Sequence, residues 1–414
     1  MGVVSCLMAA PAASQTQTQA ASNQDLTARV AAGAGYDANV FGSNLTAVAD
    51  DTLPRKGTYV SNDVSLDYSR AGSLDIGATA SSGLRLYETD RNYSAQTFSG
   101  AALVSGTIAS RLHIAVSVEA VRSSQYLFWI FPVTSYGGTV FGLPMPSLND
   151  RITPIFITTY GSDIAASYTL SRRSSLSAEY GVRRSIIRAN LPRFDTVMLG
   201  GHYSYGFTKY AGLRLGYSTQ TGVYRPSRTI TRRTIDAGIT YARPLSFSRR
   251  TKFSFAVNSL GVDDGLNTYA TVGGAATLSH QFGRFWKLNG DFDRGVSFID
   301  GFADPVLSNA VSATLKGAFG RRVDLTASSA YSRGKIGLAR SLFNDYTSGT
   351  ATVRTNIAIT RRFGLYTEYF YYRYRFNKLV ALPAGSPCQL DRNGVSAGLE
   401  LIVPIIERKR RATR

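Results

Sequence analysis

Apolar and polar residues alternate one by one along most of this chain, which is the period of a β-strand. Segment 284–298 shows the alternation clearly. Its apolar face carries Trp286, Leu288, Gly290, Phe292, Val296 and Phe298. Its polar face carries Lys287, Asn289, Asp291 and Asp293. A strand with two such faces suits a wall between lipid and a water-filled lumen.

About eighteen segments of this kind (sixteen to eighteen) follow one another between residues 27 and 405, a number typical of large outer-membrane barrels. Short connections such as "SRR", "GRR" and "TRR" alternate with longer ones such as 41–57 and 127–156. The pattern predicts an all-β fold, a transmembrane, antiparallel, up-and-down outer-membrane β-barrel with both termini in the periplasm. The alternative is a water-soluble sandwich or propeller, which should bury one face and lack this asymmetry of connections.

The regions outside the predicted barrel, 27–405, also have interpretations. Residues 1–13 fit a signal peptide that ends near Ala10-Pro11-Ala12, and the absence of a basic start suggests that it is truncated. Cys6, in "VVSC", is a second option as a lipidated residue. Residues 14–26 are expected to be a flexible periplasmic segment. Residues 406–414 form a basic periplasmic tail, and the whole places the protein in the outer membrane of a Gram-negative bacterium.

Composition agrees with a membrane barrel. The chain has 24 Tyr, 21 Phe and 39 Gly, and 18% of its residues are charged, whereas soluble domains carry about 25%. No stretch approaches the roughly 20 consecutive apolar residues that a membrane-spanning helix needs. Strands are therefore the expected means of crossing the membrane.

The net charge of +19 is concentrated in the short connections and the tail. The basic periplasmic rim is predicted to contain Arg172, Arg173, Arg249, Arg250, Arg321, Arg322, Arg361 and Arg362. One interpretation is binding to acidic lipid headgroups. The other is a funnel for an acidic polysaccharide, or a dock for periplasmic export components. Nucleic acid is not an expected partner, because no basic patch accompanies a nucleic-acid-binding fold.

The segment 361–377 is unusually aromatic. Glu368 lies near its middle and must face the lumen, because a charge facing lipid there is costly. The same face then carries a lumen aromatic ladder of Tyr366, Phe370, Tyr372, Tyr374 and Phe376. The ladder could guide a sugar, or pack against a loop such as 126–151 folded into the lumen. Arg373 and Arg375 emerge above the hydrocarbon, where lipopolysaccharide phosphates are expected partners.

Other lumen-facing charges are predicted on two strands. Together with Glu368 the set contains Lys287, Asp291, Asp293 and Arg354. No catalytic residues, cofactor or metal site are expected, since no Cys/His cluster is present. "HYS" at 202–204 is similar to a motif of outer-membrane phospholipases, but its His202 and Ser204 are predicted to face the lumen, so an enzyme is not expected.

The segment "AGAGYDANVFGS" (32–43) resembles the opening strand of the outer-membrane β-barrel porins found with exopolysaccharide operons. The residues that carry the resemblance are Tyr36, Asp37, Asn39, Val40 and Phe41. The resemblance implies a channel involved in export of an exopolysaccharide or surface polysaccharide. Two alternatives stay open: a general diffusion or sugar-uptake porin, and a non-conducting surface barrel plugged by residues 127–156.

Overall fold

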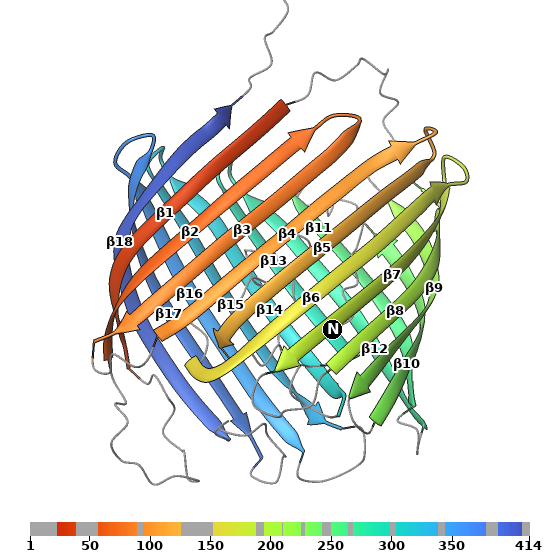
Figure 1. The fold of residues 1–414 in the computed structure, drawn as a ribbon. Helices are drawn as coiled ribbons and strands as arrows, with labels where there is room; N and C mark the ends of the chain where they lie inside the picture. Colours follow the sequence, from red (N-terminus) through yellow and green to blue (C-terminus); the bar gives the residue numbers. More distant parts are fainter. Residues whose placement is uncertain are drawn as a thin grey trace, which may run out of the picture.

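Eighteen antiparallel strands form one sheet that closes into a barrel (Figure 1). The computed structural model describes residues 23–38, 57–88, 94–125, 152–187, 194–208, 210–224, 228–241, 250–263, 268–298, 304–337, 344–377 and 388–407. The strands are β1 (Asn23–Asp37), β2 (Gly57–Ala71), β3 (Leu74–Tyr87), β4 (Ser94–Ile108), β5 (Leu112–Gln125), β6 (Ile152–Thr169), β7 (Ser174–Ile187), β8 (Phe194–Gly206), β9 (Ala211–Tyr224), β10 (Arg228–Tyr241), β11 (Thr251–Asp263), β12 (Thr268–Phe282), β13 (Trp286–Ser297), β14 (Val306–Phe319), β15 (Val323–Ile336), β16 (Asp345–Ala358), β17 (Phe363–Phe376) and β18 (Gln389–Glu407).

Each strand pairs with its neighbours in the sequence, and β1 closes the barrel by pairing with both β2 and β18. In Figure 1 the first strand, in red, lies beside the last, in dark blue. The predicted up-and-down barrel is therefore confirmed. In the part of the chain that the structure covers, no helix is long and apolar enough to cross a membrane.

The strand boundaries differ from the prediction mainly at the barrel rims. β1 begins at Asn23, inside the segment 14–26 that was expected to be flexible, and Asn23 pairs with Ala71. β6 begins at Ile152, inside the predicted connection 127–156. Near the rim a strand can pair through residues that show no apolar alternation, because both of its faces meet polar surroundings there.

The two faces of the wall differ as the alternation predicted. The outer face is rich in exposed apolar side chains, which include Val60, Leu86, Val118, Leu199, Ile235, Val272, Val311, Tyr331 and Val395. The residues that alternate with them are mostly polar or buried. An apolar exterior that runs around a closed sheet is suited to lipid and not to water. The wall is that of a transmembrane barrel.

The short turns gather at one end of the barrel, called here the turn rim, where β1 begins and β18 ends (Figure 1). The opposite end is called the loop rim. In the β16–β17 turn the hydroxyl of Thr360 accepts hydrogen bonds from the N–H groups of Arg362 (3.2 Å) and Phe363 (3.0 Å). Ser171 and Thr208 do the same in the β6–β7 and β8–β9 turns. The hydroxyl holds the turn, which leaves the adjacent basic side chains exposed.

The wall is incomplete between β12 and β13. Their pairing runs from Phe282–Trp286 only to Gly274–Arg294. Beyond that point β13 pairs with β14 alone. Arg294 lies at the break, where its Nε donates to the carbonyl of Val272 (2.9 Å) and its Nη1 donates to Asn309 Oδ1 (2.9 Å). A guanidinium thus replaces part of the missing backbone ladder.

The end of β13 leans into the lumen. Val296 and Phe298 are only 1% and 3% exposed, so the prediction that they face lipid was wrong. Arg232, on β10, donates from its guanidinium to the carbonyl of Val296. The two side chains belong to an apolar cluster, called here the β13 cluster, with Phe194, Ile230, Leu260 and Val262. Freed from β12, the strand end can bury its apolar face against lumen-facing side chains.

Candidate functional site

The lumen aromatic ladder is fully packed. All five of its members, Tyr366, Phe370, Tyr372, Tyr374 and Phe376, are at most 4% exposed. The ring centroids of Tyr374 and Phe376 lie 5.3 Å apart, and those of Tyr346 and Phe376 lie 5.8 Å apart. The rings therefore stabilise the wall and present no free face to a solute, which favours packing over sugar guidance. The loop 126–151, expected to pack there, lies outside the described residues.

Glycines on β1 and β18 make room for aromatic rings of the lumen, both in the ladder and on β2. A Cβ at Gly35 would lie 2.5 Å from Cζ of Tyr59, and a Cβ at Gly394 would lie 2.5 Å from Cζ of Phe370. Neither distance is tolerable for a real side chain, so both positions require glycine. This explains the glycine-rich start of the motif "AGAGYD" as a packing requirement.

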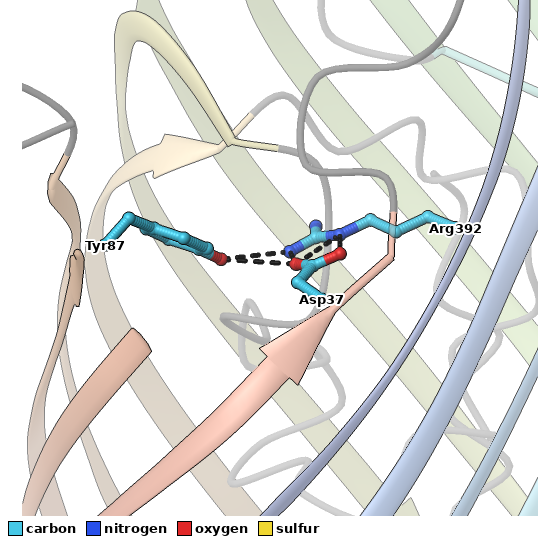
Figure 2. A network of polar contacts seen from close by, with 3 residues as sticks. All are labelled: Asp37, Tyr87 and Arg392. Carbon is cyan, nitrogen blue, oxygen red and sulfur yellow. Dashed lines mark hydrogen bonds and ion pairs between the residues drawn. The ribbon is translucent and has the colours of Figure 1, made fainter. Parts of the chain in front are cut away.

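A buried ion pair joins the first and last strands (Figure 2). Asp37 ends β1 and Arg392 lies on β18, and both side chains are 0% exposed. Arg392 Nε donates to both carboxylate oxygens of Asp37, at 3.1 and 2.9 Å, and its Nη2 donates to Oδ2. The hydroxyl of Tyr87, on β3, also donates to Asp37 Oδ2 (3.2 Å). We call these three residues the closing triad.

The surroundings of the closing triad are aromatic. The guanidinium carbon of Arg392 lies 5.3 Å from the ring centroid of Phe370. Arg85, on β3, lies 4.5 Å from the ring centroid of Tyr59 and 5.8 Å from that of Phe370. Cations over aromatic faces gain electrostatic attraction when water is excluded. The triad thus stabilises the boundary between β1 and β18, the closing seam, beside Phe370 of the ladder.

A recess of about 690 Å³ lies on the turn-rim side of this cluster. Its lining runs from Arg85, near the loop-rim end of β3, to Arg361 and Arg362 on the turn rim. The charged side chains between them are Arg29, Asp63, Asp324, Arg354, Glu368 and Glu400. The recess is therefore a polar chamber with charges of both signs that reaches the turn rim.

Arg354 is the centre of this chamber. Its Nη1 lies 3.3 Å from Glu368 Oε2, and its Nη2 lies 3.7 Å from Glu400 Oε2. Its guanidinium carbon stands 4.6 Å from the ring centroid of Tyr366. Two carboxylates and one ring fix the guanidinium, which is still partly accessible. A solute in the chamber would meet an oriented cation beside two carboxylates.

The opposite part of the lumen wall carries both carboxylates and arginines. Glu119, Asp163 and Glu179 each lie across a glycine of the next strand, at 2.5, 2.5 and 2.8 Å from where a Cβ would stand. The glycines concerned are Gly161, Gly181 and Gly200. Further round, Arg214 Nε lies 2.9 Å from Asp236 Oδ2. The lumen thus has a chamber around Arg354 on one side and, on the other, carboxylates that alternate with Arg183, Arg214 and Arg232.

The structure brings together only part of the predicted set. Arg354 and Glu368 form an ion pair, whereas Lys287, Asp291 and Asp293 are on β13, on another part of the wall. The exposed rim arginines are Arg172, Arg173, Arg250, Arg321, Arg322, Arg361 and Arg362. Asn39, Phe41 and Arg249 lie outside the described residues. Tyr36 points outward and is 41% exposed, and Asp37 belongs to the closing triad.

The prediction missed Arg85, Glu400 and Arg392 as members of the lumen site. The alternation along β3 turns Arg85 inward but gives neither its height in the barrel nor its neighbours. Arg392 could have been found as an inward charge on the last strand, because Ser396 and Glu400 share its face. Its partner Asp37 is 355 residues away in the chain, so no spacing connects them.

Other chemistry in the lumen is limited. His202 Nε2 lies 2.6 Å from Ser177 Oγ, on the lumen side, and this contact joins the neighbouring strands β7 and β8. Among the residues that the structure describes, no group of three His, Cys, Asp or Glu side chains is arranged to hold a metal ion. The arrangement is suited to binding and passage of polar solutes.

Comparisons with known proteins concern the architecture. The sequence matches no known protein family, and no curated protein matches it in sequence. The fold is similar to crystal structures of Pseudomonas aeruginosa OccK2 in complex with glucuronate (11% identity, TM-score 0.45, 93% of this chain and 98% of that chain) and a BenF-like porin from Pseudomonas fluorescens Pf-5 (9%, 0.47, 93% and 99%). Acinetobacter baumannii OccAB3 is also similar (9%, 0.44, 93% and 99%). At these identities and TM-scores the likeness carries no argument about solutes.

Proposed function

We propose that this chain is an outer-membrane channel for small hydrophilic solutes, with its turn rim toward the periplasm of a Gram-negative bacterium. The observation that carries the proposal is the chamber of about 690 Å³ around Arg354, which reaches the turn rim. Sites for small molecules commonly have volumes of about 300–1,000 Å³. Charges of both signs on the chamber wall suit sugars and other polar solutes.

The loop-rim half of the lumen supports small solutes over a polymer. The buried aromatic ladder lies on one side, and the β13 cluster extends from the other. A branched or substituted polysaccharide has a wider cross-section than a single small solute, so side-chain clusters on two sides of the lumen favour the small solute. Export of an exopolysaccharide, which the family resemblance implies, stays a prediction that none of these contacts supports.

The proposal is tested by the size dependence of permeation. Purified protein in liposomes should give swelling rates that fall steeply from monosaccharides to trisaccharides. The matched measurement in planar bilayers should show a conducting pore that long polysaccharides neither enter nor block. Absence of conductance in folded protein would contradict the proposal, as would equal passage of short and long saccharides.

The role of the chamber is tested by paired variants. Arg354→Gln should shift the channel toward cation preference, because it removes the cation held between Glu368 and Glu400. Arg184→Gln is the matched control, since Arg184 forms its ion pair with Asp195 on the outer face, with 3.0 Å between Nε and Oδ1. Equal ion selectivity in the two variants would show that the chamber does not lie on the conduction path.

A further inference from the structure

A row of basic side chains faces outward at the loop rim. Arg333 on β15 is in register with Thr347 on β16, which is in register with Arg375 on β17. Neighbouring strands lie about 4.8 Å apart, so the two arginine backbones are separated by roughly 10 Å. Both arginines are exposed, and neither forms an ion pair within the described part of the chain.

The same place is hollow. A recess of about 420 Å³ is lined by Arg333, Thr347 and Arg375, together with Asp345, Gln389 and other residues of the strand ends. One row below, Gly349 lies in register between Tyr331 and Arg373, and a Cβ there would find no atom closer than 3.9 Å. The basic row therefore borders open space at the loop-rim end of the wall, where the recess also touches the inward-facing Tyr346 and Phe376.

The nearby carboxylates, Asp345 and Asp391, are outnumbered by the basic side chains Arg333, Lys335, Arg373 and Arg375. Asp345 is in register with Lys335, and Asp391 is in register with Arg373. Each acid thus faces a further basic residue across the ladder. The row Arg333–Thr347–Arg375 continues to Gln389 and contains no acid. The two positive charges of Arg333 and Arg375 favour binding of an anion from outside the chain.

The side chains below the row place it at a membrane boundary. Toward the middle of the barrel the same outer face carries Val353, Ile357 and Leu365, all exposed and apolar. Tyr369, at 46% exposure, lies in register with Val353, and Tyr331, at 53%, lies in register with Gly349, one row before the basic row. Apolar, aromatic and basic layers in this order mark the passage from acyl chains to headgroups.

We infer that this surface binds the phosphate groups of an outer-leaflet glycolipid of the lipid A type. Guanidinium groups match phosphate oxygens in a two-point geometry, and a charged partner strengthens each hydrogen bond. The acyl chains of the same lipid would lie against Val353, Tyr331 and Tyr369. The inference uses the proposed orientation in the membrane but does not depend on which solute passes through the lumen.

The test compares two double variants of the full chain in detergent. Arg333→Gln/Arg375→Gln should weaken binding of lipid A, followed by native mass spectrometry, by about 10-fold or more, since it removes two charge-assisted contacts. Arg172→Gln/Arg173→Gln removes two exposed arginines at the turn rim and should leave the affinity unchanged. Heat-modified mobility on gels checks that both variants are folded barrels.

The chemistry of the headgroup is tested with three further probes. Dephosphorylated lipid A should bind the wild type about as weakly as lipid A binds the double variant. Inorganic phosphate should not displace lipid A at millimolar concentration, and Arg333→Lys/Arg375→Lys should restore part of the affinity. Equal affinity of lipid A for wild type and the Gln variant would overturn the inference. Equal binding of dephosphorylated lipid A would also overturn it, because the contact would then be apolar only. Displacement of lipid A by inorganic phosphate would overturn it as well, because the surface would then be a simple anion site.

Discussion

Two strand boundaries of this barrel are built in opposite ways. β1 and β18 come from the two ends of the chain, yet their ladder runs from Asp25–Glu407 to Asp37–Gly394 with one irregularity. β12 and β13 are joined by a turn of three residues, Gly283 to Phe285, yet their ladder stops at Gly274–Arg294. The boundary without a covalent connection is the more completely paired.

The difference shows where a barrel needs strong side-chain contacts. A hairpin keeps its strands together through the chain, so part of its ladder can open while the wall persists. No turn connects β1 to β18, so this closing seam depends on contacts between the two strands alone. The closing triad adds a buried ion pair to its backbone ladder. At the hairpin break, Arg294 replaces backbone bonds with side-chain bonds and β13 moves inward. The β1–β18 boundary therefore has the stronger contacts, whereas the β12–β13 boundary tolerates a local change of strand position.

The largest effect is expected at the seam. Arg392→Met should lower the free energy of unfolding by about 3–5 kcal/mol, because it leaves the Asp37 carboxylate buried without its guanidinium. Urea unfolding of the protein in lipid vesicles measures the change. Asp37→Leu/Arg392→Met should recover most of the loss, since it removes both charges. A loss below 1 kcal/mol in the single variant would mean that the ladder alone holds the seam.

The β13 cluster should give the second effect. Phe298→Ala should cost about 3 kcal/mol, because it leaves a cavity among Phe194, Ile230 and Val262. It should also raise single-channel conductance, since the β13 end would lose its anchor in the lumen. Phe292→Ala is the matched control on the lipid face of the same strand, and it should leave conductance unchanged. The same conductance in both variants would place the cluster away from the narrowest region.

A smaller effect is expected at the break itself. Arg294→Gln should cost about 1.5 kcal/mol, because hydrogen bonds to Val272 and Asn309 lose their charged donor. The change should be local. Hydrogen exchange should increase for those amides of 268–273 that point toward β13, on the part of β12 that pairs with β11 alone, and stay constant for the β1–β18 ladder. Uniform acceleration around the barrel would show that the break is not a separate unit.

The smallest effects concern the turn rim. Thr360→Ala should cost about 1 kcal/mol, because two backbone N–H groups lose the hydroxyl that they bind. Arg361→Gln/Arg362→Gln should change stability by less than about 0.5 kcal/mol, since neither side chain holds the turn. Unfolding in neutral-lipid vesicles compares them. A larger loss from the arginines than from Thr360 would give the rim a structural role.

Much of the fold was predictable because lipid and water impose the period of two on every strand. The same parity that turned Glu368 inward also turned Arg354 inward on the neighbouring strand, and the two form an ion pair. Alternation gives the face of a residue. It gives neither its height in the membrane nor its partner on a strand far along the chain, so the pairing of Asp37 with Arg392 was not predictable.

The β13 end shows a different limit. Val296 and Phe298 have the parity of the lipid face, and a strand that stayed in the wall would place them there. The sequence held one signal of the exception, because Arg294 shares that apolar face. A charge at such a position indicates that the surroundings are no longer lipid. Only the strand register shows that β12 stops pairing with β13 at Arg294.

The closing triad has a consequence for how the protein is made. Asp37 is synthesised near the start of the chain, and Arg392 follows 355 residues later. Until β18 joins β1, the carboxylate at the end of β1 lacks the Arg392 guanidinium that it meets in the closed wall. A chain that ends before residue 392 can form hairpins but cannot form this ion pair on closure. The single carboxylate therefore makes closure of the barrel depend on a complete chain.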